Sequence, residues 1–301
     1  MLDCVIIGGG PAGLNAALVM GRAGRKTILF DEDKPRNRVT QESHGFITQD
    51  GVKPSEFKKR ARTDVQKYPS VSIKEERVEI IEKASGVFRI QTKGGTDYMA
   101  KKVLLATGLR DVLPEIPSIQ NVYGTSVFSC PFCDGWEMRG QALAVIAENE
   151  RASHMGKLLS NWSDDVIVFT NGYQMLDEEK DILARQNVTV VEEKIEGVES
   201  KGGQLTSIRL QSGQEIKREA GIVVMDLVQS APFAEQLGCE ITPNGGIKVD
   251  SFGRTTVEGV YACGDTSLST PSQLVIAAAE GNKAAAGLIM DLVEAAFLLE
   301  A

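Results

Sequence analysis

The run VIIGGGPAGL, residues 5–14, constrains the fold more than any other part of the sequence. A short apolar run that ends in glycines and continues into a helix-forming segment predicts a strand, a tight turn and a helix. Gly8, Gly10 and Gly13 have the GxGxxG spacing, which permits the turn, lets the backbone approach a pyrophosphate and allows close helix–strand packing. Asp31 ends the next apolar run, where a carboxylate can accept hydrogen bonds from a ribose diol. The pattern predicts a dinucleotide site, and the acid favours FAD or NAD over NADP.

A second β-α-β pattern follows at ALAVIAEN, ERASHMGKLLSNW and DVIVFTNG, and it repeats the first. In this repeat Ala147, Asn149 and Ala152 stand where the first unit has its three glycines, and Thr170 stands where it has Asp31. The loop AENERA has no glycine and carries two glutamates, and the segment TNGYQMLDEEKD beyond the next strand is acidic. We therefore expect the scaffold of a nucleotide-binding domain without the features that hold a dinucleotide; by its resemblance to a family discussed below, the nucleotide lost would be NADPH.

The alternation of apolar strands and helical segments predicts an α/β fold with two Rossmann-like, three-layer domains. Chain breakers and the repeat place one domain at residues 1–111 and 240–301, and the second, inserted domain at 112–239. The inserted domain would hold the degenerate nucleotide-binding repeat and a CxxC motif.

Cys130 and Cys133 form that motif in CPFCDGW. Two sulfurs at this spacing can meet in one turn, and thiolate is the reactive form in dithiol exchange. A structural zinc site needs four ligands, but the chain has no second CxxC and only two histidines, so we expect no metal. A redox pair is expected, with two packed, inert thiols as the alternative. Cys4 and Cys263 fall in expected buried strands and are expected to be packing residues, and Cys239 follows Gly238 near a loop; we expect none of the three to be a resolving thiol.

The charge and composition exclude several classes of function. A net charge of −8 argues against binding to nucleic acid or to an anionic membrane, since both need a basic surface. No uncharged apolar run reaches the roughly 18 residues of a membrane span. The amino terminus has no positive leader, and five cysteines with one close pair make no disulfide framework, so we expect a cytoplasmic protein.

Four motifs in this order, GGGPAG, LLATG, CPFCDG and GVYACGD, resemble the low-molecular-weight thioredoxin reductase family of FAD-dependent disulfide oxidoreductases. The resemblance covers nearly the whole chain and implies FAD as the cofactor. It implies that Asp265 holds the ribityl–phosphate region and that a helix beginning near Ser272 points its amino terminus at the flavin. The cofactor-binding residues expected together are Gly8, Gly10, Pro11, Ala12, Gly13, Asp31, Ala106, Thr107, Gly108, Gly264, Asp265, Ser272, Gln273 and Leu274.

The same resemblance assigns roles around the CxxC motif. It implies that Cys133 faces the flavin and that Cys130 exchanges with the external thiol or disulfide. Asp134 matches the family's acidic residue, which protonates a leaving thiolate or removes a thiol proton. Partial burial would raise the pKa of this carboxyl, as such a role requires. The resemblance also implies a homodimer.

Without NADPH, electrons could run from a substrate dithiol through Cys130 and Cys133 to FAD and on to O2 or another acceptor. Such an electron path is similar to that of the gliotoxin-type dithiol oxidases, although members of that group carry His where this chain has Asp134. The stretch ESHGF also resembles a loop of that group, so His44 is a candidate near the flavin, with a polar surface role as the alternative. The substrate would be a small-molecule dithiol or a thioredoxin-like protein.

Two other functions stay open at this point. The chain also resembles the ferredoxin-dependent flavin thioredoxin reductases, in which an electron-transfer protein feeds disulfide reduction; weakly bound NAD(P)H could also feed such a reductase. A flavin-binding redox sensor with little turnover is the alternative from another class of function.

Overall fold

The structure is a computed structural model, and it describes residues 1–268 and 271–299. The chain forms two compact units. The first unit comprises residues 1–38, 45–110 and 228 onward, and the second comprises residues 39–44 and 111–227. Strands β7 (Leu109–Val112) and β16 (Asp226–Gln229), which carry the chain between the units, pair with each other in a two-stranded sheet.

The first unit is built on a seven-stranded sheet in the order β3-β2-β1-β6-β5-β4, with β17 also paired to β6. Its parallel part consists of β1 (Leu2–Ile7), β2 (Thr27–Phe30), β3 (Val71–Lys74), β6 (Asp97–Leu105) and β17 (Val260–Ala262). A hairpin of β4 (Val78–Ala84) and β5 (Val87–Thr92) adds antiparallel strands beside β6. The strand order reverses between β1 and β6, which is where open α/β sheets bind ligands.

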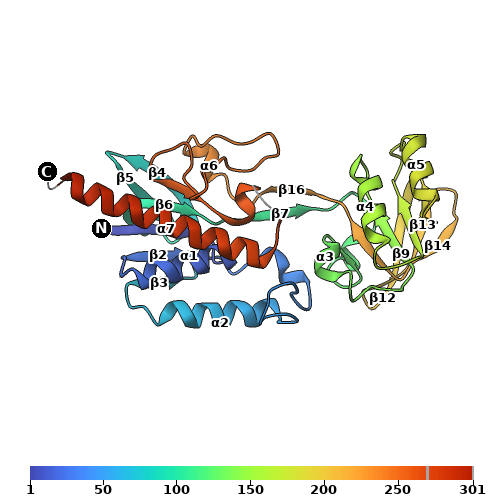
Figure 1. Cartoon of the computed structure of the whole chain (residues 1–301), viewed down its shortest axis with the longest axis horizontal. Coiled ribbons are helices and arrows are strands. Elements are labelled where there is room, and N and C mark those ends of the chain that lie inside the picture. The colour runs from blue at the N-terminus through green and yellow to red at the C-terminus, as the bar shows by residue number, and fades with distance from the viewer. Residues whose placement is uncertain (269–270, 300–301) are drawn as a thin grey trace. The chain divides into compact units, whose positions relative to one another are not determined.

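Helices and loops cover both faces of this sheet because side chains alternate along its strands. Cys4 and Ile6 of β1 face a core shared with α1 (Pro11–Arg22), α2 (Pro54–Gln66) and α7 (Leu274–Leu299). Val5 and Ile7 face the opposite core, which includes the short α6 (Phe233–Gln236). Figure 1 shows α7, drawn in red, running beside α1. The remaining elements of this unit are the 3-10 turns η1 (Arg36–Val39) and η3 (Gly264–Ser267).

The second unit is built on a parallel sheet in the order β11-β10-β9-β15-β8. Its strands are β8 (Val127–Phe128), β9 (Leu143–Ile146), β10 (Val166–Phe169), β11 (Thr189–Val191) and β15 (Ala220–Val223). One face packs against α4 (Arg151–Leu159) and α5 (Asp177–Ala184), and α3 (Pro131–Asp134) follows β8. The other face packs against an antiparallel sheet of β12 (Ile195–Lys201), β13 (Gln204–Leu210) and β14 (Glu215–Lys217), beside the turn η2 (Ile119–Asn121).

The predicted α/β class with two Rossmann-like units is confirmed. After α6, the chain forms isolated bridges that pair Ile241 with Ile247 and Val249 with Thr255. The predicted carboxyl-terminal helix begins at Leu274, and the Gln273 carbonyl accepts the Ala277 N–H at 2.9 Å, so Gln273 closes its first turn. Within residues 1–268 and 271–299, no helix is long and apolar enough to cross a membrane.

Candidate active site

The glycine turn of the first unit lies at the carboxyl edge of its parallel sheet. Gly8 follows β1 with φ +108°, and a Cβ at this position would collide with the carbonyl oxygen of Ala106. A Cβ on Gly13 would collide with the Gly8 carbonyl oxygen. The absence of a side chain at Gly13 therefore lets α1 pack closely against the glycine turn. By contrast, a Cβ on Gly10 would meet nothing within 4 Å. Gly10 therefore leaves open space at the α1 amino terminus, whose first turn has no acidic residue.

Such a helix start suits a phosphate, because its first N–H groups have no partner within the helix and carry a partial positive charge. Pro11 stands at the first helical position, where its missing N–H costs nothing, and Ala12 is buried behind it. The geometry of this cradle fits a dinucleotide pyrophosphate.

Asp31 lies against the same turn, since a Cβ on Gly9 would come within 2.5 Å of the Asp31 carboxyl carbon. The side chain is 11% exposed, and Lys58 of α2 places Nζ 2.5 Å from Asp31 Oδ2. This approach does not have hydrogen-bond geometry, and no other described residue donates to that buried oxygen. Asp31 is therefore held against the glycine turn, with this oxygen buried beside Lys58. No pattern in the sequence indicated Lys58, because it reaches Asp31 only through the packing of α2.

The other predicted cofactor motifs end at the same edge. Register pairs Ile7 with Phe30 and Leu105, and Leu105 with Ala262, so the residues following these four strands lie together. The motif residues placed there are Gly8, Asp31, Ala106, Thr107, Gly108 and Gly264.

Polar contacts connect these strand ends. Ala106 N–H donates to the Ile7 carbonyl at 2.8 Å, and the Thr107 and Thr266 hydroxyls are 3.3 Å apart. A Cβ on Gly264 would lie 2.7 Å from the Ala12 methyl group and 3.7 Å from that of Ala277. The first turn of α7 therefore lies near the glycine turn. Ser272 and Leu274 flank Gln273 at the start of α7.

Asp265 lies in η3, and Arg36 Nη2 donates to its Oδ2 at 3.2 Å. The two side chains are about a quarter exposed. Arg36 brings a guanidinium to a position expected to hold the ribityl–phosphate region, and a guanidinium binds phosphate with two parallel N–H donors. The basic run PRNR follows the strand that ends at Asp31 and could have indicated Arg36 as a phosphate-binding candidate, but this residue was not singled out from the sequence.

The dithiol lies at the start of α3 in the second unit. Cys130 precedes the helix, Pro131 occupies its first position, and the Cys133 N–H donates to the Cys130 carbonyl at 3.2 Å. The two Sγ atoms are 2.6 Å apart, so one turn of backbone holds them within reach of each other. Burial raises the pKa of the Cys4, Cys239 and Cys263 thiols, which disfavours their thiolate forms.

Asp134 follows Cys133 directly, and its N–H donates to the Cys130 carbonyl at 3.2 Å. Burial raises the pKa of the Asp134 carboxyl to about 7, helped by negative charge on Cys130 and Glu137 and opposed by His44. A carboxyl with this pKa can donate or accept a proton near neutral pH, which is what general acid–base catalysis of thiol exchange requires.

His44 belongs to the second unit, although it lies far from α3 in the sequence. Its Nε2 is 3.7 Å from Glu137 Oε1 and 3.8 Å from Glu42 Oε2, and its side chain is 18% exposed. The histidine is thus held between two carboxylates in the electrostatic surroundings of Asp134. Glu42 and Glu137 were missed, because acidic residues in loops give no periodic signal.

The second glycine-turn position is closed by side chains. Asn149 Oδ1 accepts the Arg151 backbone N–H at 3.1 Å and Arg151 Nε at 3.2 Å. Arg151 Nη2 also donates to the Met225 carbonyl and to Asp226 Oδ1, both at 3.3 Å. The Asn149 side chain therefore accepts the first N–H of α4, whereas the N-cap residue Glu150 makes no side-chain hydrogen bond to the helix.

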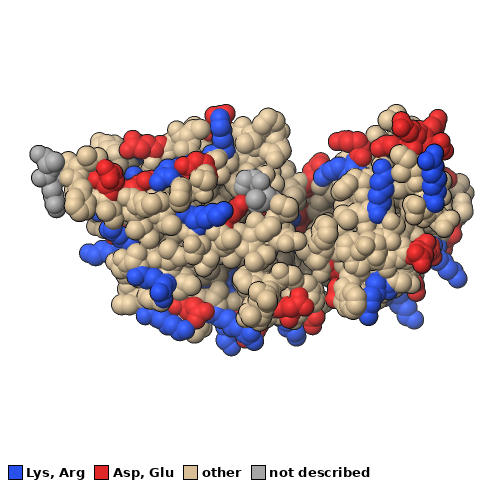
Figure 2. Space-filling view, in the orientation of Figure 1, with Lys and Arg blue, Asp and Glu red and all other residues tan. Residues whose placement is uncertain are grey.

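The residues around the start of α4 also differ from those of a phosphate-binding site, because several of them are acidic or already hydrogen-bonded. Glu148 accepts a hydrogen bond from Asn171, and the buried Thr170 hydroxyl donates to the Tyr173 carbonyl at 2.6 Å. Acidic side chains gather over α5 (Figure 2). Lys180 pairs with Asp177 at 2.9 Å and with Glu192 at 3.4 Å. These polar side chains are thus paired with one another within the second unit.

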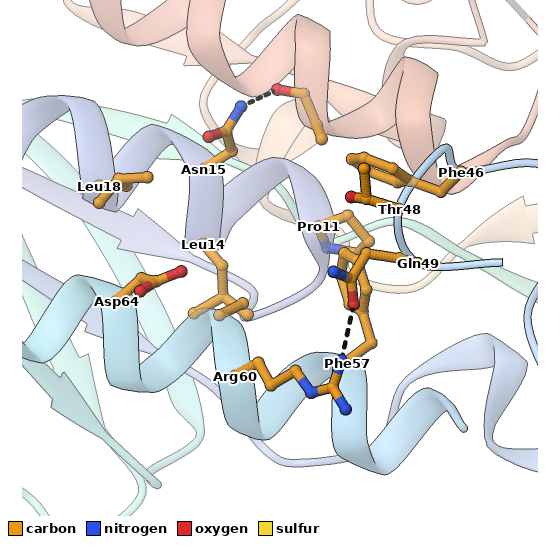
Figure 3. Close-up of a pocket in the computed structure, with 12 residues that line it drawn as sticks. Pro11, Leu14, Asn15, Leu18, Phe46, Thr48, Gln49, Phe57, Arg60 and Asp64 are labelled. Carbon is orange, nitrogen blue, oxygen red and sulfur yellow. Dashed lines mark hydrogen bonds between the residues drawn. The ribbon is translucent and has the colours of Figure 1, made fainter. Parts of the chain in front are cut away.

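A separate hollow of about 280 Å³ lies in the first unit among α1, α2, the start of α7 and residues 46–49 (Figure 3). Its aromatic wall is Phe46 and Phe57, whose ring centroids are 5.7 Å apart. Two of its polar side chains are paired across the lining, since Asn15 donates to the Ala278 carbonyl and Arg60 donates to Gln49 Oε1.

The chain matches a family model described as pyridine nucleotide-disulphide oxidoreductase over residues 2–281. It is 31% identical over 323 residues to a "Probable thioredoxin reductase" of Arthroderma benhamiae, with 96% of this chain and 80% of that protein covered. It is 30% identical over 311 residues to thioredoxin reductase tcpT of Claviceps purpurea, covering 97% and 96%. Among solved structures, the "Putative Thioredoxin Reductase TrxB" from Bacillus anthracis is 47% identical with a TM-score of 0.94, covering 98% of this chain and 99% of that one. The chain thus belongs to the pyridine nucleotide-disulphide oxidoreductase family, as a thioredoxin reductase-like oxidoreductase acting on sulfur groups.

Proposed function

We propose that this protein is an FAD-dependent dithiol oxidase that works without NADPH. Cys130 and Cys133 would take two electrons from a substrate dithiol, and O2 would be the final acceptor. The observation that supports the proposal is the start of α4, where the glycine spacing is absent and Arg151 bonds to Asn149 and to the Met225 carbonyl.

The first unit would hold FAD, in the domain proposed at residues 1–111 and 240–301. Gly10 and the α1 amino terminus would receive the pyrophosphate, Asp31 the ribose, and Arg36 with Asp265 the ribityl–phosphate region. When bound, FAD supplies the two-electron relay between a dithiol and O2 that no side chain provides.

The exchange at the dithiol balances in electrons and protons. A substrate thiolate attacks one sulfur of the Cys130–Cys133 disulfide and forms a mixed disulfide, and the second substrate thiol then displaces the enzyme sulfur. Asp134, with its pKa near 7, would protonate the leaving thiolate. The substrate leaves as a disulfide, and the enzyme holds two thiols until their two electrons and two protons pass to O2 as H2O2.

The cofactor site gives a prediction of its own. Gly10 has an extended backbone with φ −75°, which any residue can adopt, and space for a Cβ. Gly10→Val should therefore fold, but its side chain would occupy the pyrophosphate position. We expect the purified variant to contain less than about a tenth of the wild-type flavin, by visible absorbance, with unchanged circular dichroism. The matched control is Gly94→Val, at another glycine with room for a Cβ. Normal flavin content in Gly10→Val would contradict the assignment.

The donor is tested by anaerobic mixing of the oxidised holoenzyme with NADPH, NADH or dithiothreitol while flavin absorbance is followed. We expect the dithiol to bleach the flavin and both nicotinamides at micromolar concentration to leave it oxidised. Admission of air should then restore the colour and release one peroxide per dithiol consumed. Cys133→Ser is the control, because it should remove bleaching by the dithiol. Rapid bleaching by NADPH would refute the proposal, and slow recovery in air would favour a protein electron partner.

A further inference from the structure

A lysine of α2 lies beside the acid that follows strand β2. Lys58 Nζ is 2.5 Å from Asp31 Oδ2 and 2.6 Å from Asp33 Oδ1, and the lysine side chain is only 12% exposed. Asp33 has φ +56° and accepts a hydrogen bond from this ammonium group. The segment after β2 thus places the ammonium group between two carboxylates.

Stability alone is a weak reason for burying this lysine. Lysine is almost never buried unless it is paired, and the cost of desolvation often cancels the attraction within a buried ion pair. The location of the pair is more informative, because a Cβ on Gly9 would come within 2.5 Å of the Asp31 carboxyl carbon. The Asp31 carboxylate therefore lies against both the glycine turn and Lys58.

The backbone of Asp31 is held without help from this lysine. The Asp31 N–H donates to the Lys74 carbonyl at 3.0 Å, and β2 pairs with β1 on one side and with β3 on the other. The rotation of the Asp31 side chain remains to be fixed. Lys58 contacts that side chain at a buried oxygen to which no described residue donates a hydrogen bond. The ion pair is thus the contact that selects the orientation of the carboxylate.

The lysine also sets the charge beside the expected phosphate position. The pyrophosphate of FAD is dianionic, and an unpaired Asp31 carboxylate against the glycine turn would repel it. Lys58 brings a positive charge to the same place. Arg62, one turn further along α2, has another partner, since its Nη1 lies 2.6 Å from Glu75 Oε1.

We propose that Lys58 is a positioning residue for FAD, which holds the Asp31 carboxylate in the orientation that receives the ribose and offsets its charge beside the pyrophosphate. Lys58 acts through Asp31 and would not itself touch the cofactor. The inference rests on the FAD site of the proposed function and adds to it a residue from outside the dinucleotide motif. It concerns cofactor binding alone, because no step of the dithiol exchange passes through Lys58.

The test is the dissociation constant of FAD, measured from the flavin fluorescence that appears as the holoprotein is diluted. We expect Lys58→Met to raise this constant about 30-fold, because it leaves the carboxylate unpaired and free to rotate. Lys58→Arg should stay within about threefold of the wild type, since it restores the positive charge. Lys59→Met, which removes the same charge from the exposed neighbouring residue of α2, is the matched control and should change the constant less than about twofold.

A double-mutant cycle separates this role from a structural one. In the Asp31→Asn background, Lys58→Met should change the dissociation constant less than about threefold, because the group it positions is gone. A lysine that merely stabilised α2 would act in both backgrounds, so equal losses in the two would overturn the proposal. An unchanged constant in Lys58→Met would overturn it as well. Circular dichroism checks the fold of each variant, and Lys58→Gln replaces Lys58→Met in the cycle if the latter does not fold.

The outcomes also distinguish this inference from the function beneath it. If the wild-type protein binds no FAD, the cofactor site and the role of Lys58 are both wrong. If FAD binds and the cycle shows the expected coupling, but no dithiol is oxidised with O2, the dithiol oxidase function fails and the role of Lys58 stands.

Discussion

Serine in place of Cys133 is expected to abolish dithiol oxidation while leaving the protein yellow. The sulfur lies 2.6 Å from that of Cys130, and without it no disulfide can form to accept electrons. Loss of one member of a group that acts as a unit removes nearly the whole effect, so we expect peroxide formation to fall at least about 10³-fold. Cys130→Ser should cause the same loss. Turnover and flavin content are measured on the same preparation.

The three buried cysteines provide the controls for this experiment. Cys239→Ser replaces a thiol whose pKa is raised by burial and which lies beside Thr255 at 3.5 Å. It should keep turnover within about twofold of the wild type. Residual activity above a few per cent in Cys133→Ser would show that electrons reach the flavin by another route, and the assignment of the dithiol would be wrong.

Asparagine in place of Asp134 should slow dithiol oxidation by about 10² to 10³-fold, the range of a lost general acid. The pKa of this carboxyl is about 7, so the wild-type rate should decline above neutral pH as the acid loses its proton. In Asp134→Asn that decline should be absent, because the amide does not titrate. The measurement is kcat/KM against pH from 5 to 9, corrected for ionisation of the substrate thiols. An unchanged alkaline decline would exclude Asp134 as the acid.

The same variant should be more stable than the wild type in alkaline solution. The folded carboxyl binds a proton up to about pH 7, whereas in the unfolded chain it loses that proton near pH 4. The free energy of unfolding therefore falls as pH rises through this window, and it stays lower above pH 7. Asp134→Asn should regain about 1–2 kcal/mol at pH 8, a few degrees in melting temperature, and almost nothing at pH 4. Asp177→Asn, at an exposed ion pair, should give no such gain.

Much of the fold and of the proposed cofactor site follows from local sequence patterns. The glycine turn, Asp31 and the two strand-end motifs were predictable because each is tied to the end of an apolar strand. Parallel strands bring their carboxyl ends to one edge, so these motifs meet although they lie up to about 250 residues apart.

The contacts that adjust the chemistry were not predictable in this way. Lys58 reaches Asp31 from a helix surface, Arg36 reaches Asp265 across 229 residues, and His44 meets Glu137 from a loop. These are long-range pairs of polar side chains, and neither periodicity nor spacing encodes them.

The contacts of Arg151 at the start of α4 have a consequence beyond the proposed donor question. If a nucleotide had to displace this side chain, it would have to break the bonds of Arg151 to Asn149, Met225 and Asp226 before forming its own. An enzyme built on such a unit would be insulated from the nicotinamide balance of the cell. Its output would follow the supply of dithiol and oxygen, so that disulfide formation could continue while the pyridine nucleotide pool is strongly reduced.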